Sequence, residues 1–109
     1  MAYDEKLADR VRKHLAMHKG IAEKKMFGGL AFLLNGNMSV GLHDDELIVR
    51  LEPEQTDAAL GKPHTRIFDI TGRPMKGWIL VKSAGLTGGA LAKWVETGVS
   101  YAGSLPPKK

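Results

Sequence analysis

The middle of the sequence repeats apolar side chains at every second position, and this alternation constrains the fold more than any other feature. Ser39, Gly41 and His43 alternate with apolar residues in residues 38–43, and Ile48 and Arg50 do so in residues 47–51. The apolar positions are Met38, Val40, Leu42, Leu47, Val49 and Leu51. A period of two is typical of a strand with one buried face. Asn35-Gly36 is a strong hairpin signal and Asp44-Asp45 a second tight turn, so residues 23–51 predict an antiparallel meander of three strands.

Two adjacent glycines interrupt the first of these strands. The run KKMFGGLAFLL, from Lys24 to Leu34, is too long for its partner strand unless it bends, and Gly28-Gly29 is placed where a bulge or kink would bend it. A phosphate-binding glycine loop would lead into a helix N-terminus, whereas these glycines precede the strand segment Leu30 to Leu34. We therefore predict a structural bend, at which glycine also permits close approach of another backbone.

Helices are predicted at both ends of the chain. In the first, from about Asp4 to Lys19, Asp4 is the expected N-cap and Gly20 suits the left-handed C′ position. In the last, from about residue 87 or 88 to Ser104, we expect Gly98 to let the helix lie close to the sheet. Both have apolar residues at helical spacing, at Tyr3, Leu7, Val11 and Leu15 and at Leu91, Trp94, Val95, Gly98, Ala102 and Leu105.

The segment between the meander and the last helix predicts a short helix and two further strands. Pro53 fits the first position of a helix that runs to Leu60. The strands are expected at Arg66–Ile70 and Met75–Lys82, joined by a turn at residues 71–74. The order α-β-β-β-α-β-β-α predicts one α+β domain over residues 1–109, a two-layer sandwich in which an antiparallel sheet of about five strands has helices on one face.

Composition excludes several classes of function. The 109 residues include no cysteine, so disulfides, thiolate metal sites and cysteine nucleophiles are ruled out, and we expect a cytoplasmic protein. The charged N-terminus does not resemble a signal peptide, and no apolar run is long enough for a membrane span. The net charge of +4 raises the question of an acidic partner such as nucleic acid.

Residues of the types that catalysis requires do not form a recognisable site. His14 and His18 have metal-ligand spacing but no visible third ligand, so they are interpreted as partly buried or rim side chains. The run from His43 to Glu46 fits a turn, where aspartates serve local hydrogen bonds. No serine lies in a nucleophile elbow. We therefore expect no enzyme activity, metal or cofactor.

The most site-like stretch is Gly72-Arg73-Pro74-Met75-Lys76-Gly77, which places two cations at a turn before a strand with a tryptophan. Such cations can hold a phosphate or a carboxylate, and the alternative is an ordinary turn with solvated charges. Other cations that can join this surface lie in the first and fourth strands. The candidate contact residues for a partner or for nucleic acid are Lys24, Lys25, Arg66, Arg73 and Lys76.

Four sequence motifs together resemble the N-terminal domain of the TfoX/Sxy family, whose members are regulators linked to natural competence in bacteria. They are KKMFGGLAF, the Asn-Gly turn, GRPMKGWILV and the terminal SLPPK, and the resemblance extends from Tyr3 to Lys108. It implies a two-layer α/β sandwich of the kind seen in secretion-chaperone-like folds. Full-length regulators of this family carry a second, helical C-terminal domain. For these regulators, the resemblance implies that they act with the cyclic-AMP receptor protein at competence promoters. We expect this chain to be the N-terminal domain standing alone, and the resemblance supplies no catalytic residues.

These observations lead to two functional hypotheses. The first is a non-enzymatic regulatory adaptor that binds a protein of unknown identity through a sheet edge or the basic turn and can form a homodimer. Transcription and competence are the processes in which the resemblance would place it. The second is direct nucleic-acid binding through the five cations, which predicts an affinity that falls steeply with salt. An enzyme or small-ligand protein would need a pocket with convergent polar groups, such as a cleft around Trp78.

Overall fold

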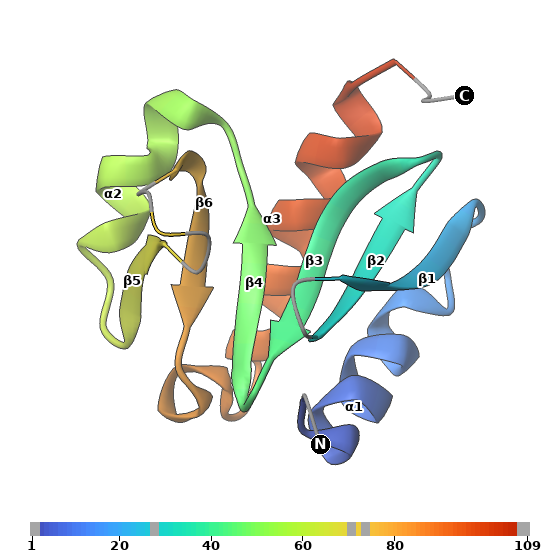
Figure 1. Ribbon diagram of the computed structural model, residues 1–109, viewed down its shortest axis with the longest axis horizontal. Helices are drawn as coiled ribbons and strands as arrows, with labels where there is room; N and C mark the ends of the chain where they lie inside the picture. Colours follow the sequence, from blue (N-terminus) through green and yellow to red (C-terminus); the bar gives the residue numbers. More distant parts are fainter. Residues whose placement is uncertain (1–2, 27–28, 70–71, 73–74, 107–109) are drawn as a thin grey trace.

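A computed structural model describes residues 3–26, 29–69, 72 and 75–106, without the side chains of Met26 and Met75. The chain forms an α+β fold in which helices cover one face of a single antiparallel sheet (Figure 1). The helical elements are α1 (Glu5–Leu15), η1 (Pro53–Gln55), α2 (Thr56–Leu60), η2 (Ser83–Leu86) and α3 (Ala90–Ser104). The strands are β1 (Ile21–Met26), β2 (Gly29–Leu34), β3 (Asn37–His43), β4 (Glu46–Arg50), β5 (Thr65–Phe68) and β6 (Met75–Val81).

The sheet has six strands in the order β1-β2-β3-β4-β6-β5, and every neighbouring pair is antiparallel. The predicted fold class and the predicted helices on one face are therefore confirmed, and the number of strands is one higher than expected. The predicted turn at residues 71–74 lies outside the described residues except for Gly72, as does Ile70 at the end of the predicted fourth strand.

The additional strand arises where the sequence predicted only a bend. β1 and β2 are two antiparallel strands, with Met26 paired to Gly29, so the chain reverses its direction between them. A Cβ atom at Gly29 would collide with the carbonyl oxygen of Leu42 in β3, so this position has no room for a side chain. The glycine is thus structural, as expected, but it begins a new strand rather than bending one long strand. Gly28 lies outside the described residues.

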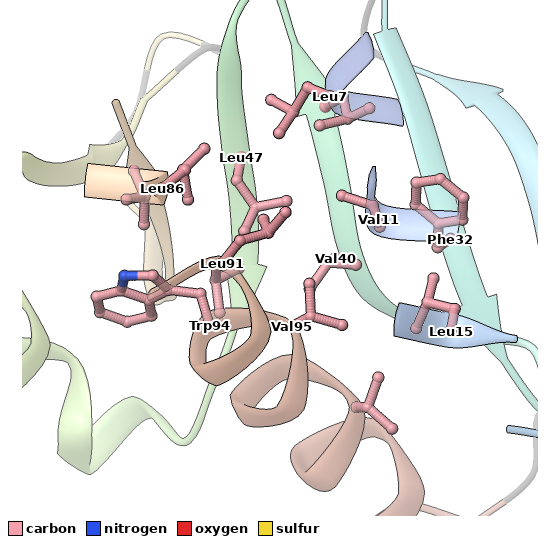
Figure 2. Close-up of a cluster of buried hydrophobic side chains, with 14 of the residues drawn as sticks. Leu7, Val11, Leu15, Phe32, Val40, Leu47, Leu86, Leu91, Trp94 and Val95 are labelled. Carbon is pink, nitrogen blue, oxygen red and sulfur yellow. The ribbon is translucent and has the colours of Figure 1, made fainter. Parts of the chain in front are cut away.

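The main core lies between the sheet and the helices. Figure 2 shows side chains of α1, of α3 and of the sheet directed into one cluster. The labelled members include Leu7, Val11 and Leu15 from α1, Leu91, Trp94 and Val95 from α3, and Phe32, Val40 and Leu47 from the strands. The helical spacing in α1 and α3 and the period of two in the strands together account for this layer.

The opposite face of the sheet is also partly buried, which corrects the expectation of a single buried face. A second cluster on this face contains Ala31, Met38, Ile48, Phe68 and Leu80, all at most 6% exposed. Half-buried Leu33 and Trp78 pack against it. The alternation in the sequence grouped Met38 with Val40 and Leu42, which is wrong: the β2–β3 register shifts between Phe32 and Leu33, and Met38 packs in the second cluster. Ser39 and Gly41, which interrupt the apolar pattern of β3, are also buried.

Helix α1 is shorter than the sequence predicted. Asp4 is the N-cap, and its carboxylate accepts hydrogen bonds from the amides of Lys6 and Leu7 at 2.9 and 3.2 Å. The helix ends at Leu15, so Gly20 does not occupy the C′ position, although it has a left-handed φ of 83° in the connection to β1. His18 therefore lies beyond the helix, where its Nε2 is 3.2 Å from Oε1 of Glu96 in α3.

Candidate functional site

An arginine lies between two aromatic rings where β4, β6 and α3 meet. Arg50 is the last residue of β4 and is paired in register with Trp78 of β6. The Arg50 guanidinium carbon is 5.1 Å from the centroid of the Trp78 ring and 5.4 Å from that of the Tyr101 ring in α3. Both distances are within the range of cation–π attraction, which is about 6 Å. We call Arg50, Trp78 and Tyr101 the aromatic–arginine cluster.

The divergence of two strands allows this contact between the sheet and α3. β3 and β4 are paired from His43–Glu46 to Val40–Val49, and the pairing stops before Arg50. Beyond that point the two strands separate, and α3 passes behind the gap between them (Figure 1). Arg50 can therefore contact a strand residue and a helix residue at the same time.

The cluster combines charge with partial exposure. Arg50, Trp78 and Tyr101 are all half-buried, and Arg50 has no ion pair with any carboxylate of the described residues. Buried Phe68 packs beneath this surface, with its ring centroid 5.9 Å from that of Trp78 at an interplanar angle of 44°. Arginine, tryptophan and tyrosine are the residues that contribute most often to the energetic centres of protein interfaces.

The cations that the sequence singled out do not lie on one surface. Lys24 and Lys25 are exposed on β1, whereas Arg66 is on β5, and these are the two opposite edges of the sheet. Four strands lie between the edges, so five inter-strand spacings of about 4.8 Å make a distance of roughly 24 Å. Lys76 is exposed on β6, next to the strand of Arg66, and Arg73 lies outside the described residues.

Arg66 already has anionic partners. Its Nε and Nη2 donate to the two carboxylate oxygens of Glu46 at 3.1 and 2.8 Å, and its Nη1 donates to Asp69 at 3.1 Å. The hydrogen bonds to Glu46 are the main cause of the raised pKa of Arg66. Much of its charge is thus neutralised within the fold, and an added anion would compete with two carboxylates.

The other polar groups considered in the sequence are spread over separate structural contacts. His43 Nδ1 is 3.5 Å from an Asp44 oxygen, while Glu46 binds Arg66. His14 is half-buried on α1, and His18 pairs with Glu96. Within the described ranges, no three His, Cys, Asp or Glu side chains are grouped as metal ligands.

Sequence reasoning did not identify Arg50 as a candidate. It appears in the sequence only as a polar residue in an alternating strand, and its partners are 28 and 51 positions away, at Trp78 and Tyr101. The available signal was its position at the end of a strand whose neighbour contains a tryptophan. That signal becomes specific only when the register between β4 and β6 is known.

The fold and this cluster together define a small α+β domain with an arginine-centred aromatic surface at one end of its sheet. The chain belongs to the TfoX N-terminal domain family, which matches residues 13–102. No curated protein and no solved structure matches the chain. Among the helices of the described part, none has the length and apolar character needed to cross a membrane.

Proposed function

We propose that this chain is a non-enzymatic interaction domain and a cytoplasmic regulatory adaptor that binds another protein through the aromatic–arginine cluster. The observation that carries the proposal is the position of Arg50, half-buried between Trp78 and Tyr101 without an ion pair among the described residues. A carboxylate from a partner would satisfy its donors in a partly desolvated setting, and the two rings would supply apolar contact area.

The regulatory part of this proposal is supported by family membership. The chain belongs to the TfoX N-terminal domain family, and its motifs resemble those of competence regulators. A role in transcription or competence would follow from the partner that the cluster recruits. In this proposal the domain itself performs no chemical step.

The sheet edges offer a second route to association, including homodimer formation. β1 and β5 are the outermost strands of the sheet, and each pairs with a single neighbour in the described part of the chain. A strand from a partner or from a second copy can pair with such an edge. Lys24 and Lys25 on β1 are typical of edge strands that resist non-specific pairing, so a specific partner strand must accommodate their charges.

Direct binding of nucleic acid is the alternative. Lys24, Lys25 and Lys76 are exposed, but the edges on which the lysines of β1 and Arg66 lie are far apart, and Arg66 is paired with carboxylates. This arrangement favours a protein partner over the phosphate backbone, because phosphate binding depends on several cations that lie along one surface.

The test is a capture experiment from native cell extract with the tagged chain, with nuclease added to half of each sample. Wild type is compared with Arg50→Glu and with the Arg73→Glu/Lys76→Glu double variant. Lys13→Glu, an exposed position on α1, is the charge-matched control. Recovered proteins are identified, purified and measured for direct binding to each variant, after unfolding curves have shown that all variants are folded.

The proposal predicts a protein that survives nuclease and binds wild type and Lys13→Glu equally, but binds Arg50→Glu at least about 10-fold more weakly. Material that disappears with nuclease, and binds the pure chain with a steep salt dependence, supports nucleic-acid binding instead. Sedimentation velocity of the pure chain over a range of concentrations tests the homodimer. Equal binding by Arg50→Glu and wild type rejects the cluster as the interface.

A further inference from the structure

A pocket of about 300 Å³ lies between α3 and the loop that joins α2 to β5. Lys62, Pro63 and His64 line it from the loop, and Ala90, Lys93 and Trp94 line it from α3. This volume is at the lower end of the range for small-molecule sites, about 300–1,000 Å³. The pocket is separate from the aromatic–arginine cluster, since none of the three cluster residues lines it.

The charges around this pocket are all positive or neutral. Two lysines and a histidine line it, and none of its lining residues is an Asp or a Glu. Among the described residues, Lys62, His64 and Lys93 form no ion pair. The Lys62 ammonium instead lies 5.1 Å from the centroid of the Trp94 ring, so a cation and an aromatic surface are presented together.

The loop that carries Lys62 and His64 is held in place by hydrogen bonds. The Thr65 hydroxyl donates to the carbonyl oxygen of Lys62 at 2.8 Å. The Lys82 amide donates to the carbonyl oxygen of His64, also at 2.8 Å, and His64 has a left-handed φ of 65°. A Cβ atom at Gly85 would come within 2.9 Å of the His64 Cβ, so the absence of a side chain at Gly85 makes room for the histidine. The cationic groups are therefore attached to a fixed backbone, which lowers the entropic cost of binding.

We infer that this pocket binds a small organic anion, a phosphate monoester attached to an aromatic or other apolar group. A phosphate monoester carries close to two negative charges at neutral pH, which matches the ammonium groups of Lys62 and Lys93. Lysine binds phosphate as a point charge, without the paired geometry that arginine requires. The apolar group would lie against Pro63 and the small exposed part of Trp94, which is 9% exposed. This ligand site goes beyond the proposed interaction surface and does not depend on it.

Phenyl phosphate is a suitable probe because it combines both parts of the inferred ligand. The full chain labelled with ¹⁵N is titrated while the backbone amides of Lys62, His64 and Ala90 and the Trp94 indole N–H are followed by NMR. Inorganic phosphate tests the anion alone, phenol tests the ring alone, and benzoate tests a singly charged carboxylate. The variants are Lys62→Gln/Lys93→Gln and the matched control Lys13→Gln/Lys19→Gln, which removes the same charge from exposed positions outside the pocket.

The expected result is saturable binding of phenyl phosphate with a Kd below about 1 mM, with the shifts concentrated at the pocket signals. We expect inorganic phosphate, phenol and benzoate each to bind several-fold more weakly. The pocket variant should weaken phenyl phosphate binding at least about 10-fold, and the control variant less than about twofold. Three outcomes overturn the inference: no saturable shift at the pocket signals, equal affinity for phenyl phosphate and a comparator, or equal affinity in the two double variants.

Discussion

Gly98 in α3 lies directly against the carbonyl oxygen of Ser39 in β3, and this contact sets how closely the helix approaches the sheet. A Cβ atom at position 98 would collide with that oxygen and would lie 2.6 Å from Cγ1 of Val40. Gly98 is buried in the middle of the helix, where glycine is otherwise unfavourable. The close packing of α3 on β3 therefore depends on the absence of a side chain here.

The first prediction is that Gly98→Ala destabilises the protein by about 1–3 kcal/mol, because the helix must move away from β3 to admit the methyl group. Urea unfolding followed by circular dichroism measures the free energy of unfolding.

Gly103→Ala in the same helix is the control, since a Cβ atom there would be 3.4 Å from Leu34 Cδ2 and position 103 is exposed. It should be neutral or stabilising by up to about 1 kcal/mol. Equal effects of the two substitutions would contradict the close approach at Gly98.

The position of Gly98 also shows what the sequence can reveal about the fold. A glycine within a helical apolar stripe has few explanations other than close packing, so its role was predicted correctly from the sequence. Periodicity and turn signals likewise located α1, α2, α3 and the strands β3 to β6, whereas η2 was not predicted. The division of the first strand into β1 and β2 was not predicted. An apolar run that contains two adjacent glycines is compatible with one bent strand and with two separate strands.

The second prediction concerns Thr56, which is fully buried and whose hydroxyl accepts a hydrogen bond from the Gly77 amide at 2.8 Å. Thr56→Val keeps the shape of the side chain but leaves this buried N–H without its partner, so the protein should lose about 1–3 kcal/mol of stability. Amide hydrogen exchange at Gly77 should accelerate at the same time.

Thr56→Ser is the matched control, because it retains the hydroxyl and removes only a methyl group. It should cost about 0.5–1.5 kcal/mol and leave the exchange rate at Gly77 close to that of the wild type, once corrected for global stability. If Gly77 exchanges at the wild-type rate in Thr56→Val, the hydrogen bond between α2 and β6 does not contribute as we argue.

The third prediction compares two arginine–glutamate pairs that have similar geometry and different burial. The Glu46 side chain that binds Arg66 is 13% exposed, whereas the Glu23 side chain that binds Arg12 is 39% exposed. Double-mutant cycles with alanine should give a coupling free energy of about 1 kcal/mol for Arg66–Glu46 and less than about 0.5 kcal/mol for Arg12–Glu23. High salt should reduce the second coupling proportionally more than the first. A larger coupling for the exposed pair would refute the role of burial.

The candidate site was harder to predict than the fold, and the reason is physical. The sequence indicates that Arg66 is a cation, but its pairing with Glu46 depends on the order of β4, β6 and β5 across the sheet. Likewise, Arg50 gains its aromatic neighbours only because β3 and β4 separate beside it. Both contacts join residues far apart in the chain. Local sequence patterns show which face of a helix or strand is buried, but they do not show which residues of two different elements contact each other.

The fourth prediction is that Arg50 stabilises the domain through both rings. Each cation–π contact contributes about 0.5–1 kcal/mol, so Arg50→Ala should lower the free energy of unfolding by about 1–2 kcal/mol. The stability of Arg50→Lys should lie between that of Arg50→Ala and that of the wild type, because lysine keeps the charge but loses the planar group that stacks on the rings.

Tyr101→Phe is the control, because it keeps the ring and should leave the contribution of Arg50 to stability nearly unchanged. A double-mutant cycle between the two positions measures this. If Arg50→Ala is as stable as the wild type, the rings do not hold the guanidinium in place, and Arg50 would then reach a partner as a flexible surface charge.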